Sequence, residues 1–274
     1  MDLQIFLRQA WLLTSIELHR VLMTRRGWVV LGAFAIIWGL ILAYPIALAA
    51  AQLQQAEVVL MLNQLLGFAG LQQVLRWPLP ELVVFWWIGL VFFPFQVLMS
   101  AADQTCSDLQ RGTLRFIVLR CSRSAIFFGR FFGQVLLQWG LISVALVATL
   151  AMAWYRQGAP SWGVVQAMGL ILLNLCILIL PLVAMLAVAS MLAKSARLAL
   201  CWSLVVWGVT AGLLQWAGAS WSLLWSVQAW LPLAQLPELF AASGDATLPH
   251  LWLPLIQTLV LLAFGWWMIQ RKAL

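Results

Sequence analysis

The stretch from 164 to 192, VVQAMGLILLNLCILILPLVAMLAVASML, contains no charged residue. A helix needs about 20 mostly apolar residues to cross the hydrocarbon core of a bilayer, and this stretch exceeds that length. Only the short segment AKSAR (193–197) separates it from a second apolar stretch, 198–217. Two such stretches joined by a charged turn predict two membrane-spanning helices that run in opposite directions.

The composition extends this pattern to the whole chain. Of the 274 residues, 65% are hydrophobic, against roughly 45–50% in a soluble domain. Six windows are long and apolar enough to span a bilayer. They are 28–51, 82–101, 127–154, 164–192, 198–217 and 251–270. The sequence therefore predicts an all-α polytopic membrane protein in which residues 1–274 form a single transmembrane domain.

The positive charges predict how these six spans are oriented. If the N-terminus is cytoplasmic, only Arg76 and Arg156 of the 15 Lys and Arg residues fall on the outer side. The eight acidic residues divide evenly between the two sides. An asymmetry in the cations alone is what the positive-inside rule expects. We therefore expect a multi-pass protein of the inner (cytoplasmic) membrane with both termini in the cytoplasm.

The first 26 residues predict a helix that lies on the membrane. Apolar residues recur near helical spacing between 3 and 22, while Arg8, Glu17 and Arg20 occupy part of the remaining surface. This pattern is typical of an amphipathic helix in the inner interface, which would turn into the first span at TRRG (24–27). An ordinary extension of the first span is the alternative.

Two outer segments are expected to differ from ordinary loops. Residues 51–75 contain helix formers but are too polar to span easily, which predicts a helix near the outer surface. Residues 219–250 are rich in Trp and Leu and are interrupted by Pro232, Pro237 and Pro249. Such a broken segment either enters the outer leaflet and returns, if neighbouring protein satisfies its backbone, or forms an interfacial loop with a tryptophan belt.

The polar residues within the predicted spans are amides and hydroxyls. They are Gln134, Gln138, Ser143, Gln166, Asn174, Ser190, Ser203, Thr210 and Gln257. We interpret them as hydrogen-bonding groups between helices. A substrate path lined by some of them is the alternative.

The sequence lacks the residues of several catalytic classes. Neither Lys194 nor Lys272 follows the glycine pattern of a Walker A phosphate-binding loop, so hydrolysis of ATP by that route is not expected. His19 and His250 fall on opposite faces, which argues against a histidine metal site. The net charge of +7 is explained by the membrane orientation rather than by nucleic acid. We therefore expect a chain that is not an enzyme and binds neither metal nor cofactor.

One loop concentrates the charge that is scarce elsewhere. The segment RGTLRFIVLRCSRSAIFFGR (111–130) contains five arginines, although charged residues make up only 8% of the chain. The region from Gln104 to Arg120 predicts a short helix broken at Gly112, followed by a second helix that runs into the third span. A basic loop that only contacts anionic lipid is one interpretation. A docking element is favoured, because Asp103 and Asp108 would be repelled by such a lipid surface.

This loop, about 102–126, resembles the first cytoplasmic loop of ABC-2 type exporter permeases. The family pattern has two acidic residues five positions apart, then Gly-Thr-Leu, an apolar stretch with a proline, an Arg, and Gly-Lys or Gly-Arg. The matching residues here are Asp103, Asp108, Gly112-Thr113-Leu114, Arg123 and Gly129-Arg130. Cys121-Ser122 stands near the place of the proline, and one residue fewer separates Gly-Thr-Leu from Arg123. LAQLPELF (233–240) is similar to a second element of the family, with Gln235-Leu236 where an asparagine is usual.

The resemblance implies a permease subunit of an ABC exporter. Two copies of a cytoplasmic ABC ATPase would bind ATP and Mg and would drive two copies of this chain, most simply a homodimer, in contact with membrane lipids. The loop would dock on the ATPase as a coupling helix. Its expected contact residues are Asp103, Asp108, Arg111, Gly112, Thr113, Leu114, Arg115, Phe116, Arg120 and Arg123. The arginines would pair with ATPase carboxylates, and Leu114 and Phe116 would be buried anchors.

The same resemblance marks the outer broken segment, and it leaves a second function open. The outer residues are Pro232, Pro237, Glu238 and Phe240. The alternative function is a membrane assembly or regulatory protein of the same fold, which anchors an ATPase without transporting a solute. A channel or a secondary carrier fits less well, because no ionisable residue lies near the middle of a span.

Overall fold

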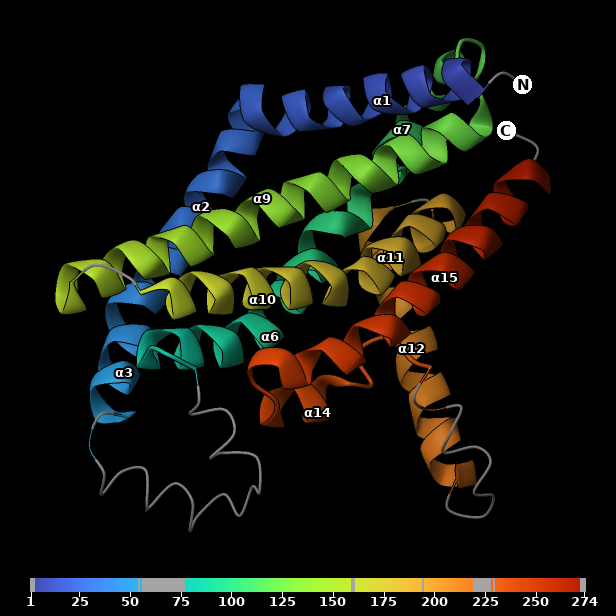
Figure 1. Ribbon diagram of the computed structural model, residues 1–274. Helices are drawn as coiled ribbons and strands as arrows, with labels where there is room; N and C mark the ends of the chain where they lie inside the picture. Colours follow the sequence, from blue (N-terminus) through green and yellow to red (C-terminus); the bar gives the residue numbers. More distant parts are fainter. Residues whose placement is uncertain are drawn as a thin grey trace.

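The computed structural model describes residues 3–53, 55, 77–158, 161–193, 195–218, 228 and 230–271. Within these ranges the chain is helical and contains no strand (Figure 1). The helix expected over 51–75 falls mostly outside the described residues, as do 219–227 and 229 of the expected outer segment. The all-α prediction is confirmed.

The N-terminal region forms two helices with a sharp bend between them. Helix α1 (Leu3–Met23) lies across one end of the bundle, and α2 (Arg25–Ile41) turns away from it. The hydroxyl of Thr24 accepts a hydrogen bond from Gly27 N at 3.1 Å and so caps α2. A Cβ at position 27 would lie 1.8 Å from Val21 O, so the bend requires glycine there. A separate helix that turns at 24–27 is therefore confirmed, and an extension of the span is wrong.

The first span then changes its helical geometry. After α2 comes a π-helical turn, η1 (Leu42–Ile46), followed by α3 (Ala47–Leu53). Pro45 lies inside this turn. Proline has no N–H to donate and clashes with the preceding helical turn, which is the usual cause of such an interruption.

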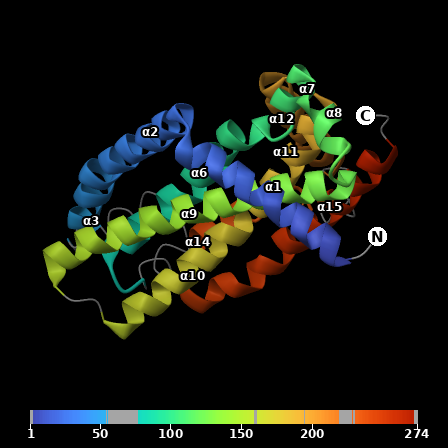
Figure 2. The same ribbon diagram turned by 90° about the horizontal axis from the view of Figure 1, so that it is seen from above.

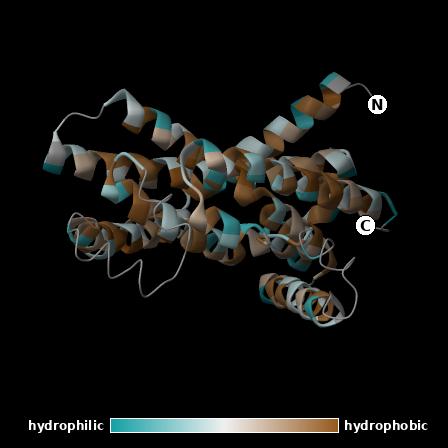
Figure 3. Ribbon diagram, turned by 60° about the horizontal axis from the view of Figure 1, so that its bottom comes forward, coloured by the Kyte–Doolittle hydropathy of each residue, from teal (hydrophilic) through white to brown (hydrophobic). Residues whose placement is uncertain are grey.

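The remaining spans follow the order predicted from the windows. They are formed by α6 (Pro80–Ser100), α9 (Arg123–Gln157), α10 (Trp162–Leu178) with α11 (Leu180–Leu192), α12 (Ala196–Gly218), and α15 (Trp252–Arg271). Among the described residues, six segments are long and apolar enough to cross a membrane, and each overlaps one predicted window. Hydrophobic residues cover most of these helices (Figure 3).

The centre of the bundle consists of α6, α10 and α11. Phe85, Trp86 and Phe93 of α6 are fully buried, as are Ile171 and Leu175 of α10. By contrast, most of α2 and α12 is exposed; α12 packs on α11 near its start, and its far end extends away from the bundle in Figure 1. The exposed side chains of α12 are almost all apolar, as expected for a helix whose surroundings are lipid or another apolar surface.

Several polar residues of the spans join different helices, as predicted. The amides of Gln134 and Gln138 in α9 donate to the Ser100 hydroxyl of α6 at 3.4 and 2.6 Å. The Asn174 amide of α10 donates to the Thr247 hydroxyl at 2.8 Å. Ser190 and Gln257 also bond to other segments, whereas Ser143, Ser203 and Thr210 bond to carbonyls of their own helices. The prediction holds for the first five residues and not for the last three.

Candidate functional site

The arginine-rich loop folds as a helical hairpin. A 3-10 turn, η2 (Ala101–Asp103), leads from α6 into α7 (Cys106–Arg111), and α8 (Thr113–Val118) follows. Between the two short helices Gly112 adopts φ 68°, a left-handed conformation that favours glycine. The predicted break at Gly112 is therefore confirmed. Figure 2 shows α7 and α8 together at one end of the bundle.

The predicted continuation of the second helix into the third span is wrong. Helix α8 ends at Val118, and α9 begins at Arg123. The Ser122 hydroxyl accepts from Ala125 N at 3.2 Å and caps α9. The first backbone N–H groups of a helix have no partner within the helix, and this cap satisfies one of them. A new helix can therefore begin here.

Two predicted site residues shape the hairpin from within. The carboxylate of Asp103 accepts from Ser107 N at 3.0 Å, in the first turn of α7. The carboxylate of Asp108 accepts from the Thr113 hydroxyl at 2.9 Å and so bridges the Gly112 turn. Both carboxylates therefore stabilise the loop geometry.

The start of the hairpin is attached to α11. The Gln104 amide donates to Val183 O at 3.2 Å, and the Cys106 thiol donates to Ser190 O at 3.3 Å. The Ser190 hydroxyl in turn donates to Thr105 at 3.3 Å. A displacement of α7 would thus have to move the fourth span or break these contacts.

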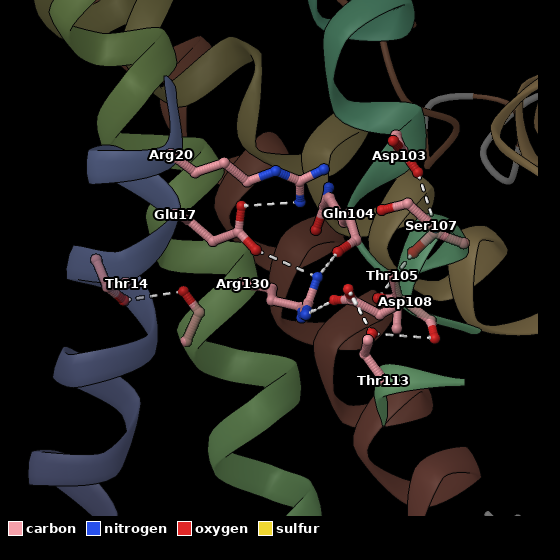
Figure 4. A network of polar contacts seen from close by, with 12 residues as sticks. Thr14, Glu17, Arg20, Asp103, Gln104, Thr105, Ser107, Asp108, Thr113 and Arg130 are labelled. Carbon is pink, nitrogen blue, oxygen red and sulfur yellow. Dashed lines mark hydrogen bonds and ion pairs between the residues drawn. The ribbon is translucent and has the colours of Figure 1, made fainter. Parts of the chain in front are cut away.

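Arg130 is the centre of a buried polar network (Figure 4). Its side chain, on α9, is only 6% exposed. The guanidinium donates to Asp108 of α7 and to the carbonyl of Gln104, and it forms an ion pair with Glu17 of α1 at 3.2 Å. A buried charge is tolerated only when it is paired and hydrogen-bonded. The network therefore links α1, α7 and α9 through a single side chain.

Small residues bring α1 and α9 into direct backbone contact. A Cβ at Gly129 would lie 2.8 Å from Ala10 O, and one at Gly133 would lie 2.9 Å from Glu17 Cβ. The Thr14 hydroxyl donates to Gly129 O at 2.9 Å (Figure 4). Since these glycines lie four apart, they face the same side of α9. Gly129 and Arg130 thus hold α1 by close approach and by charge, respectively.

The outer side of the hairpin is different from its inner side. Phe116 and Leu119 are 73% and 82% exposed, and Arg111, Arg115 and Arg120 are exposed beside them. Arg123 is half-buried. We call Arg111, Arg115, Phe116 and Leu119 the hairpin face. It combines large apolar side chains with guanidinium groups, the residue types that interfaces favour.

The position of Leu114 does not fit its expected role as an anchor of the loop on a partner. It is 6% exposed and packs with Leu13, Ala125 and Ile126 of the chain itself. Position 114 follows the Gly112 turn on the side that faces α1 and α9, so its side chain is enclosed by these helices. Asp108 is likewise occupied by Arg130 rather than free for a partner.

The described part of the outer broken segment is held by side chains from the spans. Pro232 O accepts from the Trp207 indole at 3.0 Å, and in α14 (Leu236–Ala241) the carbonyls of Leu239 and Phe240 accept from Trp86 and Trp87 at 3.0 and 3.2 Å. Pro237 lies in the first turn of α14. Carbonyls of Pro232 and of the last turn of α14 are thereby satisfied, as a short broken segment among apolar helices requires.

A contact between a carboxylate and an imidazole connects α14 to the turn before the last span. Glu238 of α14 lies 2.9 Å from His250, which belongs to the 3-10 helix η3 (Gly244–Leu251). Of the four residues predicted for this segment, Pro232, Phe240 and Glu238 therefore make contacts outside their own turn. In the described part of this segment, the donors to these carbonyls are chiefly tryptophan indoles.

A substitution of Trp86 tests this role. Trp86→Phe keeps most of the buried ring but removes the indole donor to Leu239 O, which then keeps only the bond from Ala242 N, and the loss of one such hydrogen bond costs about 0.5–1.5 kcal/mol. We expect a lower thermal midpoint and faster proteolysis of the segment 230–250. Trp216→Phe is the matched control, because that side chain is 79% exposed. Equal behaviour of the two variants would contradict the role of Trp86.

The sequence did not reveal the contribution of α1 to this site. The residue pattern places Glu17 on the polar side of an amphipathic helix, and Gly129-Arg130 matches a family pattern that gives the two residues no role. A signal was available, since Glu17 is one of only eight acidic residues and Gly129 and Gly133 show the spacing of close helix contact. Which helix would face these glycines depends on the tertiary fold.

Comparisons with known proteins agree with this architecture. A family model described as ABC-2 family transporter protein matches residues 11–269, which is nearly the whole chain. A search among curated proteins and a search among solved structures each found no match. The match includes α1 from residue 11 onward, the hairpin, and all six candidate spans up to residue 269. The chain therefore belongs to the ABC-2 family and is a multi-pass membrane permease component of an ABC transporter.

Proposed function

We propose that this chain couples ATP hydrolysis on a separate cytoplasmic ATPase to the export of a substrate. The observation that supports this most is the two-sided hairpin. Its inner side is tied to α1, α9 and α11, while the hairpin face exposes Arg111, Arg115, Phe116 and Leu119. A partner that contacts this face can therefore act on several spans at once.

The chemistry of the face fits an acidic partner with an apolar pocket. Guanidinium groups pair with carboxylates through two parallel hydrogen bonds. Aromatic and arginine side chains are the residues that most often dominate binding energy at interfaces. In the proposal, Phe116 enters a groove of the ATPase and Arg111 and Arg115 pair with carboxylates at its rim. ATP and Mg are bound by the ATPase and not by this chain.

Movement of the hairpin must be passed on to the helices that enclose the substrate path. A partner shifts a conformational equilibrium only by the difference between its contacts in the two states. The open and the closed form of the ATPase dimer would hold α7 and α8 in different positions. Through Arg130 this displacement reaches α9 and α1, and through Gln104 and Cys106 it reaches α11. Two permease copies and two ATPase copies complete the proposed unit, in the inner membrane with both termini cytoplasmic.

Charge reversal at Arg115 tests the docking surface. Arg115→Glu places like charges against the proposed carboxylates, which we expect to weaken the complex by about 2 kcal/mol or more, or about thirtyfold. The measurement is ATP turnover of the co-purified ATPase in liposomes with increasing amounts of permease. Arg25→Glu is the control, since Arg25 is exposed at the start of α2 and lies outside the hairpin.

Two outcomes of this experiment would change the proposal. Unchanged assembly and turnover in Arg115→Glu would overturn docking through the hairpin face. Normal assembly with turnover that no candidate substrate stimulates would favour the alternative function, an anchor or regulator of the ATPase without transport.

A further inference from the structure

Three distant segments meet around the start of α9. The Gln9 amide of α1 donates to Arg120 O at 3.3 Å and accepts from Ser122 N at 3.2 Å. On the other side, the Ser124 hydroxyl accepts from Trp266 and Gln270 of α15 at 3.1 and 2.9 Å. The beginning of α1, the turn between α8 and α9, and the end of α15 are therefore fixed at the same end of the bundle (Figures 1 and 2).

Each of these segments contributes arginine. We call Arg8, Arg120, Arg123 and Arg271 the arginine junction. Arg8, Arg120 and Arg271 are exposed and form no ion pair with the residues that the structure describes. The described carboxylates of α1 and the hairpin are engaged elsewhere, because Glu17 and Asp108 bind Arg130 and Asp103 caps α7. The junction is therefore a surface of net positive charge.

The junction lies at the level where the spans end. Arg123 is the first residue of one candidate span and Arg271 the last residue of another. Helix α15 has 20 residues, and at 1.5 Å per residue it covers about the 30 Å of a hydrocarbon core. A membrane that α15 crosses would thus have its boundary near Arg271.

Tryptophans mark the same boundary. Trp266 and Trp267 of α15 are about half exposed, and Trp11 of α1 is 65% exposed. The Arg271 guanidinium lies 4.3 Å from the centre of the Trp267 ring, close enough for a cation–π contact that orients it. Tryptophan is enriched at the headgroup level of membranes. The aromatic side chains therefore favour a lipid over a soluble anion as the occupant.

We propose that the arginine junction binds the headgroup of an anionic phospholipid in the adjacent leaflet. Guanidinium groups donate paired hydrogen bonds to phosphate oxygens, and the arginines come from three segments that internal hydrogen bonds hold in place. The lipid would bridge α1, α9 and α15 on the outside, where no side chain of the described chain neutralises Arg8, Arg120 or Arg271. This assigns Arg120 and Arg123 to lipid, whereas Arg111 and Arg115 remain in the hairpin face.

The test compares two double variants that remove equal charge. Arg120→Gln/Arg271→Gln changes the junction, and Arg111→Gln/Arg115→Gln changes the hairpin face. The full chain in neutral detergent micelles is titrated with dioleoylphosphatidylglycerol, dioleoylphosphatidylcholine or inorganic phosphate, and binding is followed by native mass spectrometry and by the thermal midpoint. We expect selective binding of the phosphatidylglycerol. Since one arginine near an anionic lipid contributes about fivefold in affinity, the junction variant should lose about 25-fold.

The control variant should bind like the unmutated chain. Equal losses in both doubles would show unspecific attraction of charge and would overturn the site. Equal stabilisation by inorganic phosphate or by phosphatidylcholine would also overturn it. If the junction double unfolds without lipid, Arg8→Gln/Arg271→Gln serves instead, because both side chains are exposed. No ATPase is present in these measurements, so their result is independent of the proposed coupling.

Discussion

An Arg130→Met variant is expected to lose about 3 kcal/mol of stability, the lower end of the range for a broken buried ion pair, because it leaves Glu17 and Asp108 as partly buried carboxylates without their shared cation. Their side chains are 24% and 17% exposed, so water screens them only in part. Thermal unfolding in detergent, followed by tryptophan fluorescence, measures the loss. It would be among the largest effects of any single substitution outside the apolar core.

The matched control for this variant is Arg20→Met. Arg20 also approaches Glu17, at 3.9 Å, but its side chain is 42% exposed. Exposed pairs of this kind contribute about 0–1 kcal/mol. Similar losses for Arg20→Met and Arg130→Met would contradict a special role for the buried network.

A triple variant separates stability from coupling. Glu17→Gln/Asp108→Asn/Arg130→Met removes all three charges, and replacing a whole buried ion group is often nearly neutral. We therefore expect it to recover most of the lost stability. Under the proposed function it should nevertheless show weak stimulation of the ATPase, because the connection from α7 to α1 and α9 is absent. Normal stimulation in the triple variant would show that coupling does not pass through Arg130.

Gly129→Val is expected to have the second large effect, through the contact between α1 and α9. Its Cβ would lie 2.8 Å from both Ala10 O and Leu13 Cβ. Backbone cannot move aside as a flexible side chain can, so α1 must shift away from α9. Overpacking of this kind costs about 1–3 kcal/mol or more. Hydrogen exchange should show reduced protection of residues 3–23.

Gly140→Val provides the control on the same helix. A Cβ at position 140 meets no atom within 4 Å, so the variant introduces the same β-branched residue without a clash. We expect its exchange pattern to match that of the unmutated chain. If both variants loosen α1 equally, the cause would be a general effect of valine on α9 rather than the close approach at Gly129.

Together these results would explain the Gly129-Arg130 pair. Glycine at 129 lets α1 approach the backbone of α9, and arginine at 130 then reaches Glu17 and Asp108. The ion pair between Arg130 and Glu17 thus depends on the short separation of α1 and α9. The resemblance to the ABC-2 pattern identified the two residues, and the fold shows what they contact.

Helix α1 shows which structural features the pattern of residues predicts and which it does not. Its helical spacing and the bend at Thr24 were predictable, because a capping residue and a glycine follow an amphipathic stretch. Its packing on α9 was not, since a helical pattern shows an apolar face but not the surface that covers it. The same limit explains Leu114, whose apolar side chain is compatible with a partner pocket or with the chain's own interior.

The sequence by itself determined the class of the protein, the six apolar segments and the hairpin break at Gly112, because hydrophobic length, charge scarcity and backbone conformation are local properties. Only the tertiary structure decided which charges are used inside the molecule and which face outward. Arg130 and Arg115 are the same residue type in one basic loop, yet the first is buried against Glu17 and Asp108 and the second is exposed. The physical reason is that burial and ion pairing depend on contacts between segments more than 100 positions apart in the chain, such as α1 and α9, and no local pattern encodes these contacts.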